Sequence, residues 1–166
     1  DSDLKENAQS SGNDIYFYMN DQFLNYEIED WDFDYNTTHA KLDAWINIPL
    51  LSYQQDNVFQ MVYGNESISS GSNSLGVWDS SYKGVWHLDN TPNYPEASMV
   101  DSSNYLNDGT PYGGFSLEDV VEGKISNTLF IEDGNSGQYI DCGNDEEFDF
   151  TEEMTIEFWI YFDENP

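Results

Sequence analysis

Positive charge is nearly missing from this chain. The sequence has no arginine and only four lysines against 33 aspartates and glutamates, which gives a formal net charge of −29. Nucleic-acid binding needs Lys and Arg to neutralise phosphates, and anionic membrane surfaces repel an acidic protein. The composition therefore excludes both as partners. Two interpretations of the acid remain, namely a solubilising surface, which composition alone favours, and carboxylates that hold divalent cations.

Cysteine and long apolar runs are also scarce. Cys142 is the single cysteine, so an internal disulfide and a cysteine-based zinc site are excluded. A lone cysteine beside a strand pattern is typically a small core residue. No apolar run is long enough for a membrane span or a signal peptide. Aromatic residues make up 16 % of the chain, which is ample for packed cores.

Short alternating patterns dominate the first half of the sequence. Residues 1–12 are polar and acidic, which predicts a flexible leader. Strand-forming residues follow at 15–19, and apolar residues alternate with polar ones at 24–28 and 40–48. Pro49 ends the last of these, and 58–63 forms a further strand pattern. These short strands with polar turns predict a small antiparallel β-sandwich over 13–75.

The stretch Gly76–Asn90 divides the chain. Two tryptophan-bearing apolar pairs, Val77-Trp78 and Val85-Trp86, flank a short polar run and predict short strands with a turn between them. We interpret 76–83 as a joint and 84–166 as a second module. The fold class predicted for the whole chain is all-β, with two consecutive antiparallel β-sandwich modules of jelly-roll type, the second incomplete.

The first module resembles a domain of unknown function that is common in archaeal and bacterial surface proteins. The resemblance covers about Asn13 to Ser74, and Tyr16 departs from it, because the family often has arginine there. The matching residues are Asp14, Ile15, Tyr26, Glu27, Ile28, Glu29, Trp31, Trp45, Pro49, Tyr63, Gly64 and Asn65. The resemblance implies an extracellular, cell-surface location and no assigned activity. The sequons at Asn36 and Asn65 fit that location as candidate glycosylation sites.

Glu27 and Glu29 form the one pattern here that suggests catalysis. Carboxylates on one strand face serve as nucleophile and acid in β-sandwich glycosidases, and these two would lie about 6.5–7 Å apart along the strand. The alternative is that they form the solvated face of an amphipathic strand. We favour the solvated face, because no pocket that would raise a pKa is indicated nearby.

The second module resembles the N-terminal part of a laminin-G-like, concanavalin A-like jelly roll. The matching residues are Trp86, Leu88, Asp101, Ser102, Asn107, Asp108, Gly109, Thr110, Gly123, Lys124, Leu129, Tyr139, Ile140, Gly143 and Trp159. Alternation at 154–162 predicts a long strand with Met154, Ile156 and Phe158 on one face. A whole jelly roll of this kind needs about twice the length of 84–166, so the strand lacks partners within the chain.

Two binding sites are candidates in the second module. Trp159, Tyr161 and Glu157 share a strand face that suits glycan binding, because aromatic rings stack on sugars; the alternative, which we favour, is that other strands cover this face. Asp101, Asn107, Asp108 and Asp133 supply oxygen donors on loops, as a Ca²⁺ site requires, although such residues also favour turns simply for backbone reasons. Turns are the interpretation that the spacing favours. His87 is interpreted as a half-buried strand residue and His39 as a loop residue.

These observations predict a non-catalytic, extracellular cell-surface module. We expect it to be adhesin-like, to bind a glycan or a surface protein, and to have Ca²⁺ as its candidate stabilising ion. A second hypothesis is a subunit of an extracellular, pilus-like filament that self-associates by strand exchange. A third is an accessory part of a glycoside-active enzyme.

Overall fold

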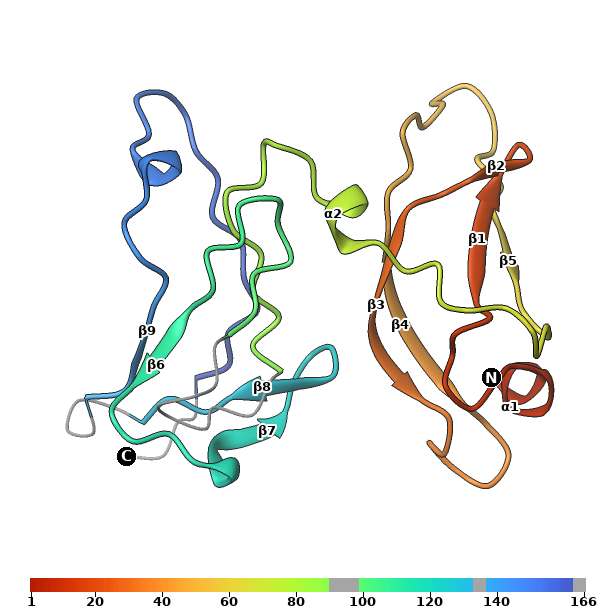
Figure 1. Ribbon diagram of the computed structural model, residues 1–166, viewed down its shortest axis with the longest axis horizontal. Helices are drawn as coiled ribbons and strands as arrows, with labels where there is room; N and C mark the ends of the chain where they lie inside the picture. The colour runs from red at the N-terminus through yellow and green to blue at the C-terminus, as the bar shows by residue number, and fades with distance from the viewer. Residues whose placement is uncertain (90–98, 133–136, 163–166) are drawn as a thin grey trace.

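The computed structural model describes residues 1–89, 99–132 and 137–162. Strands joined in small antiparallel sheets dominate this part of the chain, which confirms the all-β class. Figure 1 shows two groups of strands, one from the first module and one from the second, with a short helix between them. The sheets are small, and the sandwich arrangement within each group stays a prediction.

The first sheet lies at the start of the first module. It contains β1 (Tyr16–Met19), β2 (Gln22–Phe23) and β5 (Gln60–Val62) in the order β2-β1-β5. Asn20 and Asp21 connect β1 to β2 with φ angles of 50° and 60°. Two successive positive φ angles are what a two-residue hairpin turn with the right twist requires, and Asn and Asp tolerate them. The strand patterns at 15–19 and 58–63 therefore predicted β1 and β5 correctly.

The longest strand pair of the structure is β3 (Tyr26–Asp32) with β4 (Lys41–Ile46). Glu27 lies opposite Trp45, and the register shifts by one residue between Ile28 and Asp30. Glu29 is therefore the extra residue of a β-bulge, a feature that bends a strand and redirects its side chains. Lys41 contacts both Asp30 and Asp43, at 2.9 and 2.8 Å, and so offsets the repulsion of two aspartates that face each other across the pair.

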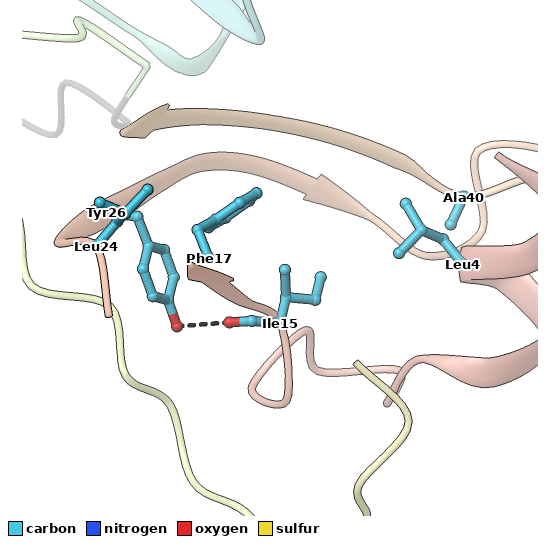
Figure 2. Packing of buried hydrophobic residues seen from close by; sticks show 6 residues of the cluster. All are labelled: Leu4, Ile15, Phe17, Leu24, Tyr26 and Ala40. Atoms are coloured by element: carbon cyan, nitrogen blue, oxygen red, sulfur yellow. Dashed lines mark hydrogen bonds between the residues drawn. The ribbon is translucent and has the colours of Figure 1, made fainter. Parts of the chain in front are cut away.

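The core of the first module lies under these strands. Its fully buried members are Leu4, Ile15, Phe17, Leu24, Tyr26 and Ala40. Figure 2 shows Leu4 beside Ala40 at one end of the cluster and Phe17, Leu24 and Tyr26 grouped at the other. The Tyr26 hydroxyl donates a 2.6 Å hydrogen bond to the Ile15 carbonyl, which satisfies the polar end of a buried ring.

The predicted flexible leader 1–12 is instead partly helical. Helix α1 (Ser2–Asn7) begins at Asp1, whose side chain accepts hydrogen bonds from the backbone N–H groups of Asp3 and Leu4. Leu4 is 4 % exposed and belongs to the core. A polar composition hid this arrangement, because polar contacts attach the helix as well as Leu4 does: Lys5 donates to the Phe33 carbonyl and pairs with Asp34.

Asp14 connects the segment 1–12 to the turn that follows the strand pattern 58–63. Its buried carboxylate accepts hydrogen bonds from the backbone N–H groups of Gln9, Gly64 and Asn65, at 2.9, 2.7 and 3.1 Å. Gly64 has a φ of 94°, a conformation that favours glycine. The two motifs of the resemblance at Asp14 and Gly64-Asn65 therefore meet in space and have a structural role.

The joint begins with a helix where strands were expected. Helix α2 (Ser74–Val77) lies between the two groups of strands in Figure 1. Val77 and Trp78 are both buried, so their apolar character reflects burial in the joint rather than a strand. At Val85-Trp86, where the second short strand was expected, the described residues form an isolated β-bridge between Trp86 and Asp101.

The described part of the second module contains two small strand pairs. Strand β6 (Thr110–Tyr112) pairs with β9 (Tyr139–Asp141), and β7 (Val120–Glu122) pairs with β8 (Asn127–Leu129). Short 3-10 helices occur at η1 (Leu117–Asp119) and η2 (Glu146–Phe148). The buried core residues here are Met99, Phe115 and Leu129. Gly134–Gly137, whose glycine and polar residues predict a hairpin turn before Tyr139, lies largely outside the described residues.

The strand predicted at 154–162 is absent from the described strands. Ile156, Phe158 and Tyr161 are 70 %, 72 % and 89 % exposed, so neither face of this segment is covered. A strand needs hydrogen-bonding partners, and no neighbouring strand is paired with these residues in the described part of the chain. The sequence pattern was apolar enough for a core strand, but pattern alone does not supply the pairing.

Candidate functional site

A cluster of charged and aromatic side chains, here called the joint cluster, connects the two modules. It consists of Glu27, Glu29, Trp45, Trp78, His87 and Ser102. Glu27 is at its centre and is 9 % exposed. Its carboxylate accepts hydrogen bonds from Trp78 Nε1 at 2.7 Å and from the Ser102 hydroxyl at 2.5 Å. A first-module carboxylate is thus held by donors from the joint and from the second module.

His87 lies between the two glutamates of β3. Its Nε2 is 3.3 Å from Glu27 Oε2, and its Nδ1 is 3.3 Å from Glu29 Oε1. The Nε2 contact lacks the alignment of a hydrogen bond, so the pairing with Glu27 is one of charge. Glu29 also accepts a hydrogen bond from Trp45 Nε1. The β-bulge at Glu29 places this second carboxylate where it can face the same imidazole.

Aromatic rings form the walls of the joint cluster. The centroid of Trp78 is 5.3 Å from that of Trp45 and 5.0 Å from that of Tyr82. The His87 ring lies 6.4 Å from both tryptophan rings and is stacked on Trp45. These rings keep water away from the carboxylates, which strengthens the electrostatic interaction inside the cluster.

Carbonyl groups of the joint are bound from both modules. Asn47, after β4, donates to the carbonyls of Gly76 and Val77, and Asn104 of the second module donates to those of Leu75 and Trp78. The last carbonyls of a helix have no partner within it, so they accept such bonds readily. Helix α2 is therefore fixed from two sides.

Protonation in the cluster follows from burial and from these contacts. Burial alone would raise the pKa of Glu27, but the contacts with His87, Ser102 and Trp78 outweigh it and lower that pKa. Burial alone would lower the pKa of His87, whereas Glu27, Glu29 and Asp89 together raise it. Both shifts favour an imidazolium beside an ionised Glu27.

The expectation that Glu27 and Glu29 form a solvated strand face was wrong. The Glu29 side chain is 5 % exposed, and both carboxylates are bound by tryptophan N–H groups and faced by His87. This arrangement commits the two carboxylates to contacts within the protein. The arrangement provides an electrostatic contact between the modules, but it leaves little of either carboxylate open to a substrate.

Trp159, Tyr161 and Glu157, the residues predicted to bind a ligand, all lie exposed on the segment 154–162. Trp159 and Tyr161 are 73 % and 89 % exposed, so the favoured expectation that other strands cover this face is wrong for the described residues. Lys124 Nζ lies 5.8 Å above the Trp159 ring. The two rings remain open to a partner.

The residues predicted to bind Ca²⁺ are only partly brought together. The buried Asp101 carboxylate accepts from the backbone N–H groups of Val85, Ser103 and Asn107 and from the Ser103 hydroxyl. These bonds fix the loop, as the turn interpretation expects. Asn107 and Asp108 line an open hollow together with Asp141 and Asp145. Asp133 lies outside the described residues.

Among the described residues, no three or more His, Cys, Asp or Glu side chains are grouped so as to hold a metal ion. The prediction of a Ca²⁺ site therefore rests on the oxygen donors that the Asp and Asn residues of these loops supply.

Asn36 and Asn65, the candidate glycosylation sites, are exposed on loops of the first module. Each side chain oxygen accepts a backbone hydrogen bond from the residue two positions later, Thr38 or Ser67. His39, the other histidine, lies exposed beside the first of these loops and contacts the Thr38 hydroxyl.

Sequence reasoning missed the partners in the joint cluster. It described His87 as a half-buried strand residue and assigned Trp78 to the joint, but it did not connect either residue with Glu27. His87 is half-buried but lies outside the described strands. One signal was present. Tryptophans next to a proposed module boundary are usually buried rather than exposed, and a histidine lies near them in the sequence. The first module offered two carboxylates, of Glu27 and Glu29, and a further tryptophan, Trp45, as their partners.

Comparison with known families gave one match. The family model described as Domain of unknown function (DUF2341) matches residues 11–93. The match runs past the expected limit near residue 74, through α2 and Trp78, and includes His87. The joint cluster, apart from Ser102, thus lies inside the matched region.

No curated protein and no solved structure matched the chain. None of the helices in the described part of the chain is long and apolar enough to cross a membrane.

Proposed function

Because the chain belongs to the family described as Domain of unknown function (DUF2341), whose description assigns no activity, we propose its function from its surfaces and its joint. The protein is a non-catalytic, extracellular cell-surface module of adhesin-like type that binds a glycan or a surface protein. The observation that carries this proposal is the exposure of Trp159 and Tyr161 beside Glu157.

The chemistry of that segment suits a sugar or a protein surface. Exposed tryptophan and tyrosine rings offer flat apolar area with a polar edge, and a carboxylate beside them accepts hydrogen bonds from hydroxyl groups. The commitment of Glu27 and Glu29 to the joint cluster supports a non-catalytic role. The acidic composition supports a location in an ion-rich exterior, where the exposed sequons at Asn36 and Asn65 can be modified.

A glycan array probed with the whole chain tests this function. We expect binding that is lost in Trp159→Ala and retained in Tyr53→Ala, which removes an aromatic ring that is 94 % exposed elsewhere on the surface. A blank array for the wild type, together with no capture of purified surface proteins, would contradict the proposal. Equal loss in both variants would show that the segment 154–162 is not the binding surface.

The second module, on this proposal, is the N-terminal part of a laminin-G-like, concanavalin A-like jelly roll. The antiparallel pairs β6–β9 and β7–β8 support it, as does the pairing of Trp86 with Asp101. Both residues belong to the motifs that carry the resemblance. An experimental structure in which the pairs β6–β9 and β7–β8 belong to two stacked sheets is the expected outcome.

A filament subunit is the second candidate function. The observation that favours it is the apolar segment Met154–Phe162, whose two faces are both exposed and which offers a strand to a neighbour. Light scattering on the purified chain tests it. We expect concentration-dependent association that Ile156→Asp abolishes, whereas a strictly monomeric wild type would contradict strand exchange.

Calcium is proposed as a stabilising ion at the hollow lined by Asn107 and Asp108. Thermal melts with Ca²⁺ and with a chelator test this, because an ion that binds only the folded state raises the melting temperature. We expect Ca²⁺ to raise the melting temperature of the wild type. Asp108→Asn should remove this rise, whereas Asp34→Asn, at an exposed aspartate of the first module, should keep it. An unchanged melting temperature would contradict a Ca²⁺ site.

A further inference from the structure

His87 has a carboxylate at each end of its ring. Its Nε2 and Nδ1 lie 3.3 Å from oxygens of Glu27 and Glu29 respectively. A neutral imidazole has one N–H and one lone pair, so in either tautomer it turns a lone pair toward a carboxylate. The doubly protonated ring has no lone pair and places a positive charge between the two carboxylates, an attraction that does not require the hydrogen-bond alignment that Nε2 lacks. The geometry therefore distinguishes the two charge states of His87 strongly.

The titratable neighbours of His87 come from both sides of the joint. Glu27 and Glu29 face it from β3, and Asp89 acts on it from its own segment. Trp45 from β4 and Trp78 after α2 pack against the ring and carry no charge. Every titratable group that faces His87 in this cluster is thus an acid, so the cluster has an excess of negative charge whenever the imidazole is neutral.

Other cations are engaged elsewhere in the described structure. Lys5 pairs with Asp34, and Lys41 pairs with Asp30 and Asp43, so both act within the first module. Lys83 contacts the Tyr105 hydroxyl and the Ser80 carbonyl. His87 is the group placed to supply positive charge against the two buried glutamates.

We propose that the joint cluster is a pH-dependent latch, in which protonated His87 holds Glu27 and Glu29 and so fixes the second module rigidly to the first. Loss of the proton removes the positive charge between the two carboxylates and leaves one of them facing a lone pair, and the modules then move independently about the joint. The raised pKa of His87 means that the latch closes below that pKa and opens as pH rises through it. The lowered pKa of Glu27 sets the acid limit, below which protonation of this carboxylate also opens the latch. This inference concerns motion between modules and does not depend on the ligand proposed above.

NMR relaxation of side-chain methyl groups in the whole chain tests the latch. Ile15 and Leu42 report on the first module, and Leu129 and Ile140 report on the second. Near pH 6, where the imidazolium is favoured, we expect one shared rotational correlation time for both pairs of probes. Near pH 9 we expect the two modules to show separate, shorter correlation times while their methyl shifts stay dispersed.

Variants separate the latch from a merely structural contact. His87→Gln should show separate correlation times at both pH values, and His39→Gln, at the exposed loop histidine, should behave as the wild type. Glu29→Gln removes one counter-charge, so the opening transition and the imidazole titration of His87 should both move to lower pH. A wild type that tumbles as one body at both pH values would overturn the proposal, as would a Glu29→Gln variant whose transition does not move.

Discussion

Two segments of this molecule share a pattern of alternating apolar and polar residues but differ in strand pairing and burial. Strand β3 reads Tyr-Glu-Ile-Glu-Asp-Trp, and 155–160 reads Thr-Ile-Glu-Phe-Trp-Ile. The first is paired along its length with β4 and carries a buried tyrosine and a buried glutamate. The second has no strand partner among the described residues, and its Ile156 and Trp159 are exposed.

The difference shows what alternation does and does not determine. It places side chains on two faces, but the partner decides whether those faces are buried. In β3 even the polar face is covered, because His87, Trp78 and Ser102 arrive from later in the chain to bind Glu27. The segment 154–162 meets no such contacts, so its acid and its aromatic rings remain available.

The largest effect is expected from truncating the core residue of β3. Tyr26 is fully buried, packs edge-on against Phe17 and donates to the Ile15 carbonyl. Tyr26→Ala should lower the free energy of unfolding by about 3–5 kcal/mol, as for other large aromatic truncations. Urea denaturation measures it. Ile160→Ala is the matched change in the exposed segment and should stay within about 0.5 kcal/mol of wild type.

Removal of the central carboxylate comes next. Glu27→Ala leaves Trp78 Nε1 and the Ser102 hydroxyl without their acceptor and removes a counter-charge from His87. Because unsatisfied buried groups keep their desolvation cost, we expect a loss of about 3 kcal/mol in the free energy of unfolding. Glu157→Ala changes an exposed carboxylate and should be nearly silent. Similar losses at the two positions would remove the distinction between the segments.

A smaller effect is expected from the tryptophans. Trp45→Phe keeps an aromatic ring in the wall of the joint cluster but removes the N–H that Glu29 accepts from. We expect a loss of about 1–2 kcal/mol, because a hydrogen bond to a charged group is stronger than the average one. Trp159→Phe in the exposed segment should leave the urea midpoint unchanged. A silent Trp45→Phe would show that Glu29 does not depend on this donor.

The smallest effect is expected from a change of pH, because titration removes a charge from a side chain without removing its heavy atoms. Since the pKa of His87 is raised on folding, its contribution is present below the unfolded value of 6.5 and is lost as pH rises through the folded value. Since the pKa of Glu27 is lowered, its contribution is present above 4.5 and is lost as pH falls through the folded value. Urea midpoints measured across pH should therefore decline at both ends. His87→Gln should flatten the alkaline side and, because His87 also helps to lower the pKa of Glu27, should weaken the dependence on the acid side as well. An unchanged alkaline limb in that variant would contradict the assignment.

The sequence predicted the strands of the first module well, since Leu24–Ile28 and Ala40–Ile48 show the two-residue period and their turn residues are strong. It could not predict that Glu27 is buried, because the donors come from residues about 50 to 75 positions away in the chain. It missed α1 because Leu4 is a single apolar residue in a polar segment, and it overestimated the strand at 154–162 because pairing is not a local property.

The claim on which the account depends is that Glu27 and His87 hold the two modules together through an interaction of charge. A double-mutant cycle of Glu27→Gln and His87→Gln, followed by urea denaturation near pH 6, tests it most directly, because both substitutions remove charge and keep similar size. We expect the loss from the double variant to be smaller than the sum of the single losses by about 1 kcal/mol or more. Losses that add within about 0.3–0.5 kcal/mol would show that the two residues do not interact, and would contradict the account.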